Sequence, residues 1–212
     1  MSTKNRFKDP DLHTPAHDAI MLWLQDNARE IMFRHFEMDK LIDEARQKVE
    51  AFRKSNSLTE EKSPDFDAAM NCSIDSLGVL VKWEVPVSFH GGQRYIDMQI
   101  KAVLNVPTVE MGGSYKEISK KIEGVWRSDT VFVSDGKSYF RSRSHKFNLS
   151  CEVKSTIGSI GELIRQLRQY ESPGALVAVV SPDDRFRDVI ESQGFIFIKA
   201  PKPDVGPQGA LI

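Results

Sequence analysis

An acid and an amine alternate at the end of a predicted strand near residue 150. The segment 148–155 has the sequence NLSCEVKS, and because strand side chains alternate, Glu152 and Lys154 point to the same side. Asp97 is a second acid, alone in the middle of the alternating segment 94–103. If these two strands are neighbours, the carboxylates of Asp97 and Glu152 converge on one hard cation.

This combination of side chains suits the hydrolysis of a phosphodiester, which resists attack by water. Carboxylate oxygens hold Mg²⁺ or Mn²⁺, which polarises the phosphoryl oxygen and lowers the pKa of bound water. A lysine beside the cation orients the water and stabilises charge in the transition state. Asp97, Glu152 and Lys154 are therefore the predicted catalytic residues, and Asp97 and Glu152 the predicted metal ligands.

Structural roles for the same residues remain open at this point. Asp97 pairs with Arg94 or Lys101 in one alternative, and Glu152 and Lys154 form a surface ladder of opposite charges in another. Other acids compete for the metal-binding role. We prefer Asp97 over Asp129, at a strand edge, and Asp135, in a turn.

The order of these residues resembles the PD-(D/E)XK nuclease superfamily over about residues 77–200. The resemblance rests on Asp97, on Glu152-Val153-Lys154 and on Gln166 and Tyr170 in the following segment, GELIRQLRQY. It implies an α/β, restriction-endonuclease-like core with a mixed central sheet flanked by helices. It also implies that Gln166 lies near the active site, whereas Tyr170 lies either there or in the core. The resemblance further implies a glutamate from a preceding helix, for which Glu30, Glu37 and Glu44 are candidates; Glu84, on the strand just before Asp97, is another candidate. The sequence departs from the family in having Ile96 where proline often precedes the acid, and in the long separation of Asp97 from Glu152.

Nucleic acid would have to bind at a local basic patch. Lys and Arg number 29 against 30 Asp and Glu, so the formal charge of −1 argues against binding over the whole surface. The predicted contacts are one strip and one helix position, Arg141, Arg143, His145, Lys146 and Arg165. The alternative is that the strip is an ordinary solvated strand.

One long helix is expected at residues 14–54, beginning at Thr14-Pro15. Its apolar residues recur at alternating spacings of four and three, which predicts a seam along one side. Either this seam forms a dimer arm, or the helix packs on its own domain or breaks. The seam comprises Leu24, Ala28, Ile31, His35, Met38, Ile42, Ala45, Val49 and Phe52.

A polar linker at 55–64 then leads to the predicted nuclease domain at 65–200. We expect a hairpin over residues 77–103, a short helix at 115–122 and a second hairpin at 130–140. The C-terminal third reads β-α-β-α-β, with strands at 147–154, 175–180 and 195–199, and a capping box at Ser159 and Glu162. Residues 201–212 are a predicted flexible tail.

The composition indicates a globular protein of the cell interior. There are two cysteines, no apolar leader in residues 1–11 and no apolar run long enough for a membrane helix, so we expect a cytoplasmic location and no membrane partner. The predicted function is a Mg²⁺- or Mn²⁺-dependent DNA endonuclease, acting on duplex or branched DNA as a homodimer. The alternative is a non-catalytic module that binds nucleic acid or protein and retains the nuclease fold.

Overall fold

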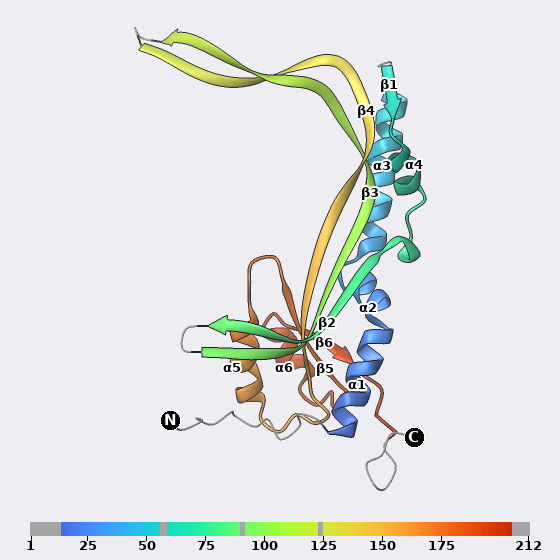
Figure 1. Cartoon of the computed structure of the whole chain (residues 1–212), viewed down its shortest axis with the longest axis vertical. Coiled ribbons are helices and arrows are strands. Elements are labelled where there is room, and N and C mark those ends of the chain that lie inside the picture. Colours follow the sequence, from blue (N-terminus) through green and yellow to red (C-terminus); the bar gives the residue numbers. More distant parts are fainter. Residues whose placement is uncertain (1–13, 56–58, 90–91, 123–124, 205–212) are drawn as a thin grey trace. The chain divides into compact units, whose positions relative to one another are not determined.

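The computed structural model describes residues 14–55, 59–89, 92–122 and 125–204, and Figure 1 shows their arrangement. The fold is α/β, with a mixed sheet in the order β2-β3-β4-β5-β6 and β1 paired to β4. The chain divides into two compact units. Unit 1 contains the chain up to residue 36, residues 78–103 and residues from 146 onward, and unit 2 contains residues 37–77 and 104–145.

Three helices take the place of the single helix predicted at 14–54. They are α1 (Pro15–Asp26), α2 (Ala28–His35) and α3 (Met38–Ser55). The predicted start is confirmed, because the Thr14 hydroxyl accepts the His17 backbone N–H at 3.1 Å. The helix is interrupted at Asn27, whose amide donates to the Trp23 carbonyl, and again at Glu37, whose φ of 46° no α-helix accommodates. The prediction of one continuous helix is therefore wrong.

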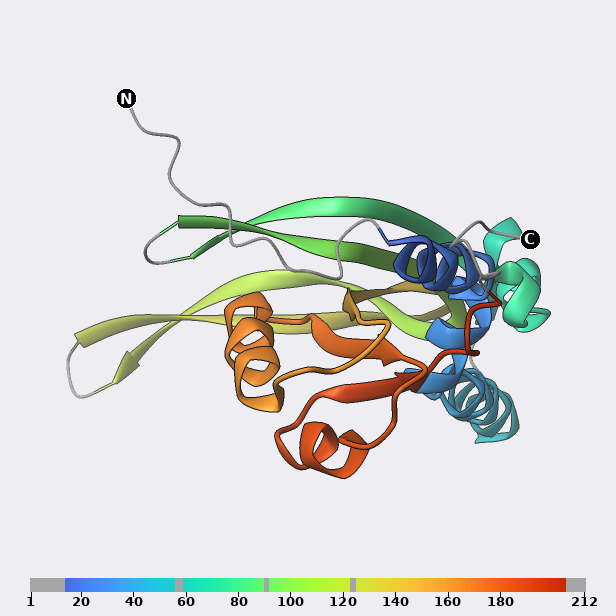
Figure 2. The ribbon, with the colours of Figure 1, turned by 90° about the horizontal axis from the view of Figure 1, so that it is seen from below.

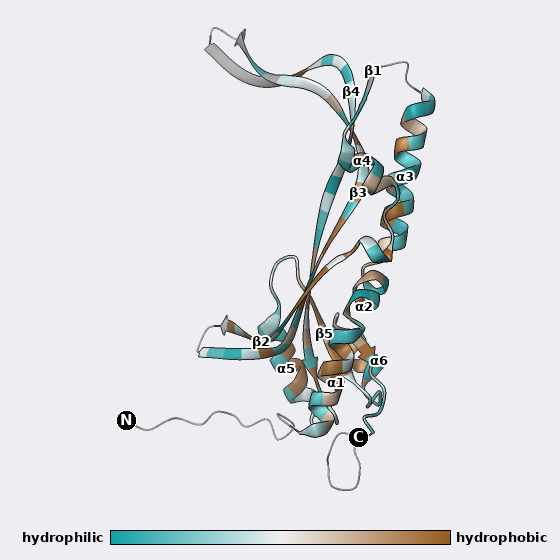
Figure 3. Cartoon of the chain, turned by 45° about the vertical axis from the view of Figure 1, so that its right-hand side comes forward, coloured by the Kyte–Doolittle hydropathy of each residue, from teal (hydrophilic) through white to brown (hydrophobic). Residues whose placement is uncertain are grey.

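The apolar seam of these helices is buried within the chain. Six of its nine residues are buried, namely Leu24, Ala28, Ile31, Met38, Ile42 and Val49. Figure 3 shows apolar and hydrophilic positions alternating along the helices, as expected when one side packs against the rest of the protein. The seam consequently gives no separate support to dimerisation through this region.

Unit 1 contains the hairpin and the alternating C-terminal elements that the sequence predicts. β2 (Gly78–Phe89) is antiparallel to the first part of β3 (Gly92–Ile122). The end of β4 (Val125–Val153) is parallel to β5 (Leu176–Ser181), which is parallel to β6 (Ile196–Lys199). α5 (Ile160–Tyr170) and α6 (Arg187–Ser192) lie between these strands in the chain, so the β-α-β-α-β order is confirmed. In Figure 2, α1 lies on the opposite side of β5 and β6 from α5 and α6.

A compact apolar core fixes α5 against the sheet. The Ser159 hydroxyl caps the helix by accepting the Glu162 N–H at 3.4 Å. Leu163, Leu167 and Tyr170 follow at helical spacing and are buried against Val177, Val179, Ile190, Phe195 and Phe197. Removing a buried leucine from such a core costs about 2–5 kcal/mol. The helix therefore holds its other side, which carries Gln166, in a fixed position beside β4.

Unit 2 contains the remaining parts of β3 and β4, together with α3, α4 (Pro64–Met70), β1 (Thr59–Lys62) and the short 3₁₀ helix η1 (Ile74–Ser76). Phe66 and Phe140 form its core with Val49, and the guanidinium of Arg53 lies over both rings. β1 lies inside the segment predicted as a linker and pairs in parallel with residues 137–140 of β4.

The prediction for residues 104–146 is wrong. β3 continues to Ile122 and β4 starts at Val125, so there is neither a helix at 115–122 nor a separate hairpin at 130–140 among the described residues. The turn-like residues 134–137 instead make an irregularity within β4, where Gly136 has a φ of 79° and Asp135 accepts the Lys137 N–H. The side-chain hydrogen bond typical of a turn forms here, but the chain does not reverse its direction.

Two other predictions fall partly outside the described residues. The polar segment 1–11 lies outside them, as do residues 205–212 of the predicted tail. Residues 201–204 have no regular secondary structure. Within the described part of the chain, no helix combines the length and the apolar character that crossing a membrane requires.

Candidate functional site

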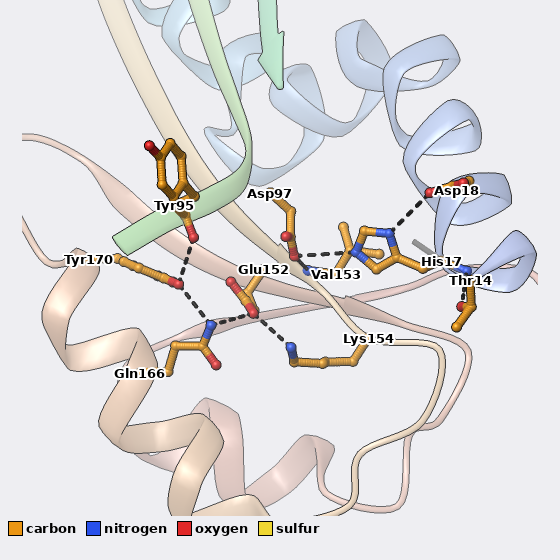
Figure 4. Close-up of polar contacts among 10 residues, drawn as sticks. All are labelled: Thr14, His17, Asp18, Tyr95, Asp97, Glu152, Val153, Lys154, Gln166 and Tyr170. Carbon is orange, nitrogen blue, oxygen red and sulfur yellow. Dashed lines mark hydrogen bonds and ion pairs between the residues drawn. The ribbon is translucent and has the colours of Figure 1, made fainter. Parts of the chain in front are cut away.

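Glu152 lies on the second-to-last residue of β4 and is 2% exposed. Its register partner on β5 is Val179, which packs in the α5 core, so Glu152 faces α5. One carboxylate oxygen, Oε1, is held by two donors: Lys154 Nζ at 2.8 Å and Gln166 Nε2 at 2.6 Å (Figure 4). Burial excludes the solvated charge ladder as an account of Glu152 and Lys154.

The other oxygen of Glu152 is buried and makes no hydrogen bond among the described residues, although the Tyr170 hydroxyl is near enough to lower the pKa of this carboxyl. Such an orphaned acceptor is expensive in a protein interior and commonly marks a position for an ion, a water or a ligand. Burial, together with repulsion from Asp97, raises the pKa of Glu152 to about 7, although Lys154 acts in the opposite direction. The site therefore contains a carboxylate that a second cation would stabilise.

Asp97 belongs to the same cluster. Its Oδ2 accepts the backbone N–H of Val153 at 2.7 Å, which joins β3 to the residue directly after Glu152. Figure 4 shows the two carboxylates beside each other. Because they are close, the charge of Asp97 raises the pKa of Glu152. Asp97 thus contacts Val153 and His17, and among the described residues it pairs with neither Arg94 nor Lys101.

His17 is the residue that the sequence did not reveal. It lies in the first turn of α1, its side chain is 7% exposed, and its Nε2 is 3.6 Å from Asp97 Oδ2. Its Nδ1 is 3.5 Å from Asp18 Oδ1, so the ring lies between two carboxylates. The only local signal is a histidine in a capped first turn, which is common in helices. Nothing in the sequence connects it with an acid on a distant strand.

Gln166 and Tyr170 link α5 to the acids. Gln166 Nε2 also approaches the Tyr170 hydroxyl at 2.8 Å, and that hydroxyl donates to the Tyr95 carbonyl at 3.0 Å. Burial and the charge of Glu152 raise the pKa of Tyr170, so the hydroxyl remains protonated and able to donate. Tyr170 thus has both of the roles considered from the sequence, because its ring packs in the core and its hydroxyl contacts Gln166 beside Glu152. Gln166 is partly buried and bonded, not part of a solvated helix face.

The loop after Lys154 is fixed by contacts of its own. Lys154 N–H donates to the Val180 carbonyl at 3.0 Å, which continues the pairing with β5 for one residue beyond the strand. Farther on, Asp183 accepts the Ile157 N–H at 3.1 Å and pairs with Arg185. These hydrogen bonds lower the pKa of Asp183 and keep it charged. Hydrogen bonds of the backbone therefore fix the chain at Lys154 itself and again at Ile157, three residues later.

The other acids considered from the sequence lie elsewhere. Glu30 and Glu44 are exposed and pair within their helices, with Arg34 and Lys48, and Glu37, between α2 and α3, is exposed and pairs with Lys40. Glu84 is exposed and has a φ of 48°. Asp135 belongs to unit 2, and the side chain of Asp129 lies outside the described part. The structure brings none of these described side chains into the cluster of Asp97 and Glu152.

The predicted basic strip is divided between the two units. Arg141, Arg143 and His145 belong to unit 2 and Lys146 to unit 1. Arg141 is 3.6 Å from Glu110 and stacks over Tyr139, while burial and the charge of Arg143 lower the pKa of His145. Arg165 is exposed on α5, one residue before Gln166.

A divalent cation fits the donors at this site. No group of three or more His, Cys, Asp and Glu side chains in the described ranges has the arrangement of a metal centre. Mg²⁺, however, is usually held by one or two carboxylates and completes its shell with waters and substrate phosphates. Asp97 and the orphaned Oε2 of Glu152 match that requirement, whereas a structural zinc site needs four closed ligands.

Comparison of the chain with protein-family models, curated proteins and solved structures gave no match. The function must therefore be argued from the geometry and chemistry of this cluster.

Proposed function

We propose that this protein is a nuclease that hydrolyses DNA phosphodiester bonds with the help of Mg²⁺ or Mn²⁺. One observation carries the proposal: buried Glu152 has one oxygen held by Lys154 and Gln166 and the other unbonded, beside a second buried acid. Strongly perturbed ionisable groups that cluster in this way are typical of functional sites. The order of elements and residues supports a restriction-endonuclease-like core of the PD-(D/E)XK type.

In this proposal Asp97 and Glu152 hold the cation, and the imidazole of His17, with Nε2 3.6 Å from Asp97 Oδ2, lies beside that carboxylate. When bound, the cation would polarise the phosphoryl oxygen and neutralise charge on the leaving oxygen. Asp18 Oδ1 lies 3.5 Å from the other ring nitrogen of His17.

Lys154 has two roles in the same scheme. Its ammonium favours the ionised form of Glu152, and it is the one cationic side chain bonded to that acid in the part of the chain described. Placed beside the acids, it orients the attacking water and stabilises the negative charge that develops on the phosphoryl group. Gln166 positions Glu152, and Tyr170 positions Gln166.

Cleavage at internal bonds and action as a homodimer are parts of the proposal that rest on the resemblance alone. Two copies of the site would cut the two strands of a duplex or branched DNA.

The test is cleavage of supercoiled plasmid and of circular single-stranded DNA, with Mg²⁺, with Mn²⁺ and with neither. Both substrates are circular, so any cut is endonucleolytic. We expect Glu152→Gln and Lys154→Ala to lower the rate by about a thousandfold, since each removes several kcal/mol of transition-state stabilisation. Lys48→Ala is the control, because Lys48 is exposed and lies in unit 2. Equal cleavage by all four proteins would eliminate the site.

The alternative, a non-catalytic nucleic-acid-binding module, makes a different prediction. It predicts salt-sensitive DNA binding but no heat of Mg²⁺ binding in a calorimetric titration, in wild type and Glu152→Gln alike. The nuclease proposal predicts heat with wild type only.

A further inference from the structure

One face of the sheet in unit 1 is covered by helices α1 and α2. The indole N–H of Trp83 on β2 donates to Gln25 Oε1 of α1 at 2.8 Å. Phe147 on β4 packs its ring on Phe36, directly after α2, with centroids 4.9 Å apart. These two contacts identify which side chains of β2 and β4 point toward the helices.

The opposite face carries three lysines. By alternation, Lys82 and Lys146, the neighbours of Trp83 and Phe147, point away from α1 and α2. Lys82 pairs with Gln99 across β2 and β3, and Leu80 pairs with Lys101, so Gln99 and Lys101 lie on the same face. Lys82, Lys101 and Lys146 are all exposed, whereas the intervening Ile100 and Ala102 are buried on the other side.

This open face leads along β4 to Glu152, because Lys146, Asn148 and Ser150 precede Glu152 in steps of two. On β3, Lys101 and Gln99 are separated by the same steps from Asp97, whose carboxylate lies instead beside His17 of α1, while its neighbour Ile96 packs in the core with α5. At about 3.3 Å per residue, Lys101 lies about 13 Å and Lys146 about 20 Å along the strands from the acids. Helix α5 covers this face at Glu152, and the exposure of the row decreases toward that end, from Lys146 through Asn148 to the buried Ser150.

The face is positively charged and carries apolar side chains between its charges. In the described ranges, none of the three lysines has a carboxylate within ion-pair distance, and the exposed acid along β2 is Glu84. Leu80 and Val103 are 53% and 39% exposed beside Lys101. Phosphates match the lysines, and apolar side chains match the faces of unstacked bases, which a duplex keeps inside.

We propose that this face, consisting of Leu80, Lys82, Gln99, Lys101, Val103, Lys146 and Asn148, binds a single nucleic-acid strand and guides it toward Glu152. The inference rests on the proposed nuclease function and narrows its substrate from duplex or branched DNA to a single strand. Three strands spaced about 4.8 Å apart make a surface about 10 Å wide between Lys82 and Lys146, which suits one strand lying on an open sheet.

The test measures binding without cleavage. A fluorescein-labelled 20-nucleotide oligothymidine and a duplex of the same length are titrated in EDTA, with fluorescence anisotropy as the readout. The proteins are wild type, the triple variant Lys82→Glu/Lys101→Glu/Lys146→Glu, and a control of equal charge change, Lys40→Glu/Lys48→Glu/Lys202→Glu, at exposed positions elsewhere. Circular dichroism checks that each variant is folded.

We expect wild type and control to bind the single strand more tightly than the duplex. The triple variant should lose about tenfold or more in affinity at 0.1 M salt, and its plot of log affinity against log salt should be shallower by about 2. Equal losses in the triple variant and the control would overturn the proposal, as would tighter binding of the duplex by wild type. Because no metal is present, a failure of the nuclease proposal appears only in the cleavage assay.

Discussion

Ion pairs along α3 in unit 2 lie at the surface, whereas unit 1 buries Asp97, Glu152 and His17 together. In unit 2, Lys48 pairs with Glu44 one helical turn away, and both side chains are more than half exposed. In unit 1, the Glu152 side chain is 2% exposed and its Lys154 partner 12%. Pairs of the first kind contribute little to stability, and removing one partner from the second kind is costly.

The difference locates in unit 1 a buried, charged cluster that lowers the stability of the folded state at neutral pH. Of the buried polar residues described, all the ionisable ones lie in unit 1, and Ser138 is the member in unit 2. A carboxyl whose pKa is raised to about 7 weakens the fold at neutral pH unless something binds it. Such a group is explained more readily by function than by architecture.

The largest expected effect comes from removing the charge of Asp97. Asp97→Asn keeps the shape and an acceptor for the Val153 N–H but weakens cation binding, so we expect about a thousandfold slower cleavage. The matched change in unit 2 is Asp135→Asn, which should leave the rate within about twofold. If the two variants cleave equally, the contrast between the units has no functional meaning.

Unit 2 should instead be sensitive to loss of its aromatic core. Phe140 is fully buried against Phe66 and Phe52, so Phe140→Ala should cost about 3–5 kcal/mol of unfolding free energy. Hydrogen exchange would show where stability is lost. We expect faster exchange in residues 104–122 and 133–145 and unchanged protection in α5 and β5. Uniform acceleration throughout the chain would mean that the units do not unfold separately.

A pH titration tests the raised pKa of Glu152. Because only the ionised carboxylate binds a cation, Mg²⁺ affinity should fall about tenfold for each pH unit below about 7. Without metal, the folded state retains a proton that the unfolded state loses above pH 4.5, so the free energy of unfolding should decrease as pH rises from about 4.5 to about 7. Calorimetry and thermal melts at pH 5, 6, 7 and 8 measure both trends. A flat profile, or Glu152→Gln with the wild-type profile, would contradict them.

The smallest effects are expected at Glu30, Glu37 and Glu44, among which the sequence could not choose. Each is exposed and pairs with a lysine or arginine three or four residues away, so alanine at each should change the unfolding free energy by less than about 0.5 kcal/mol. Cleavage should also be unaffected. A strong loss of activity in any one of them would show that the acid approaches the site in a conformation different from this one.

The sequence by itself determined the local features whose causes lie within a few residues. The alternation that places Glu152 and Lys154 on one side of a strand, the capped amphipathic helix α5 and the β-α-β-α-β order all follow from short-range periodicity, and all are present. Gln166 was recognised through the motif, and the structure bonds it to Glu152.

The tertiary structure decided what depends on distant partners. A seam with helical spacing could not show that Asn27 and Glu37 interrupt the helix, because six of its nine residues are buried even though the helix is interrupted. Turn residues in 134–137 could not show that β4 continues, because pairing with β1 and β3 stabilises the extended chain. His17 reached Asp97 only when α1 packed on the sheet. Contacts of this kind join residues far apart in the chain, and periodicity within one segment contains no information about them.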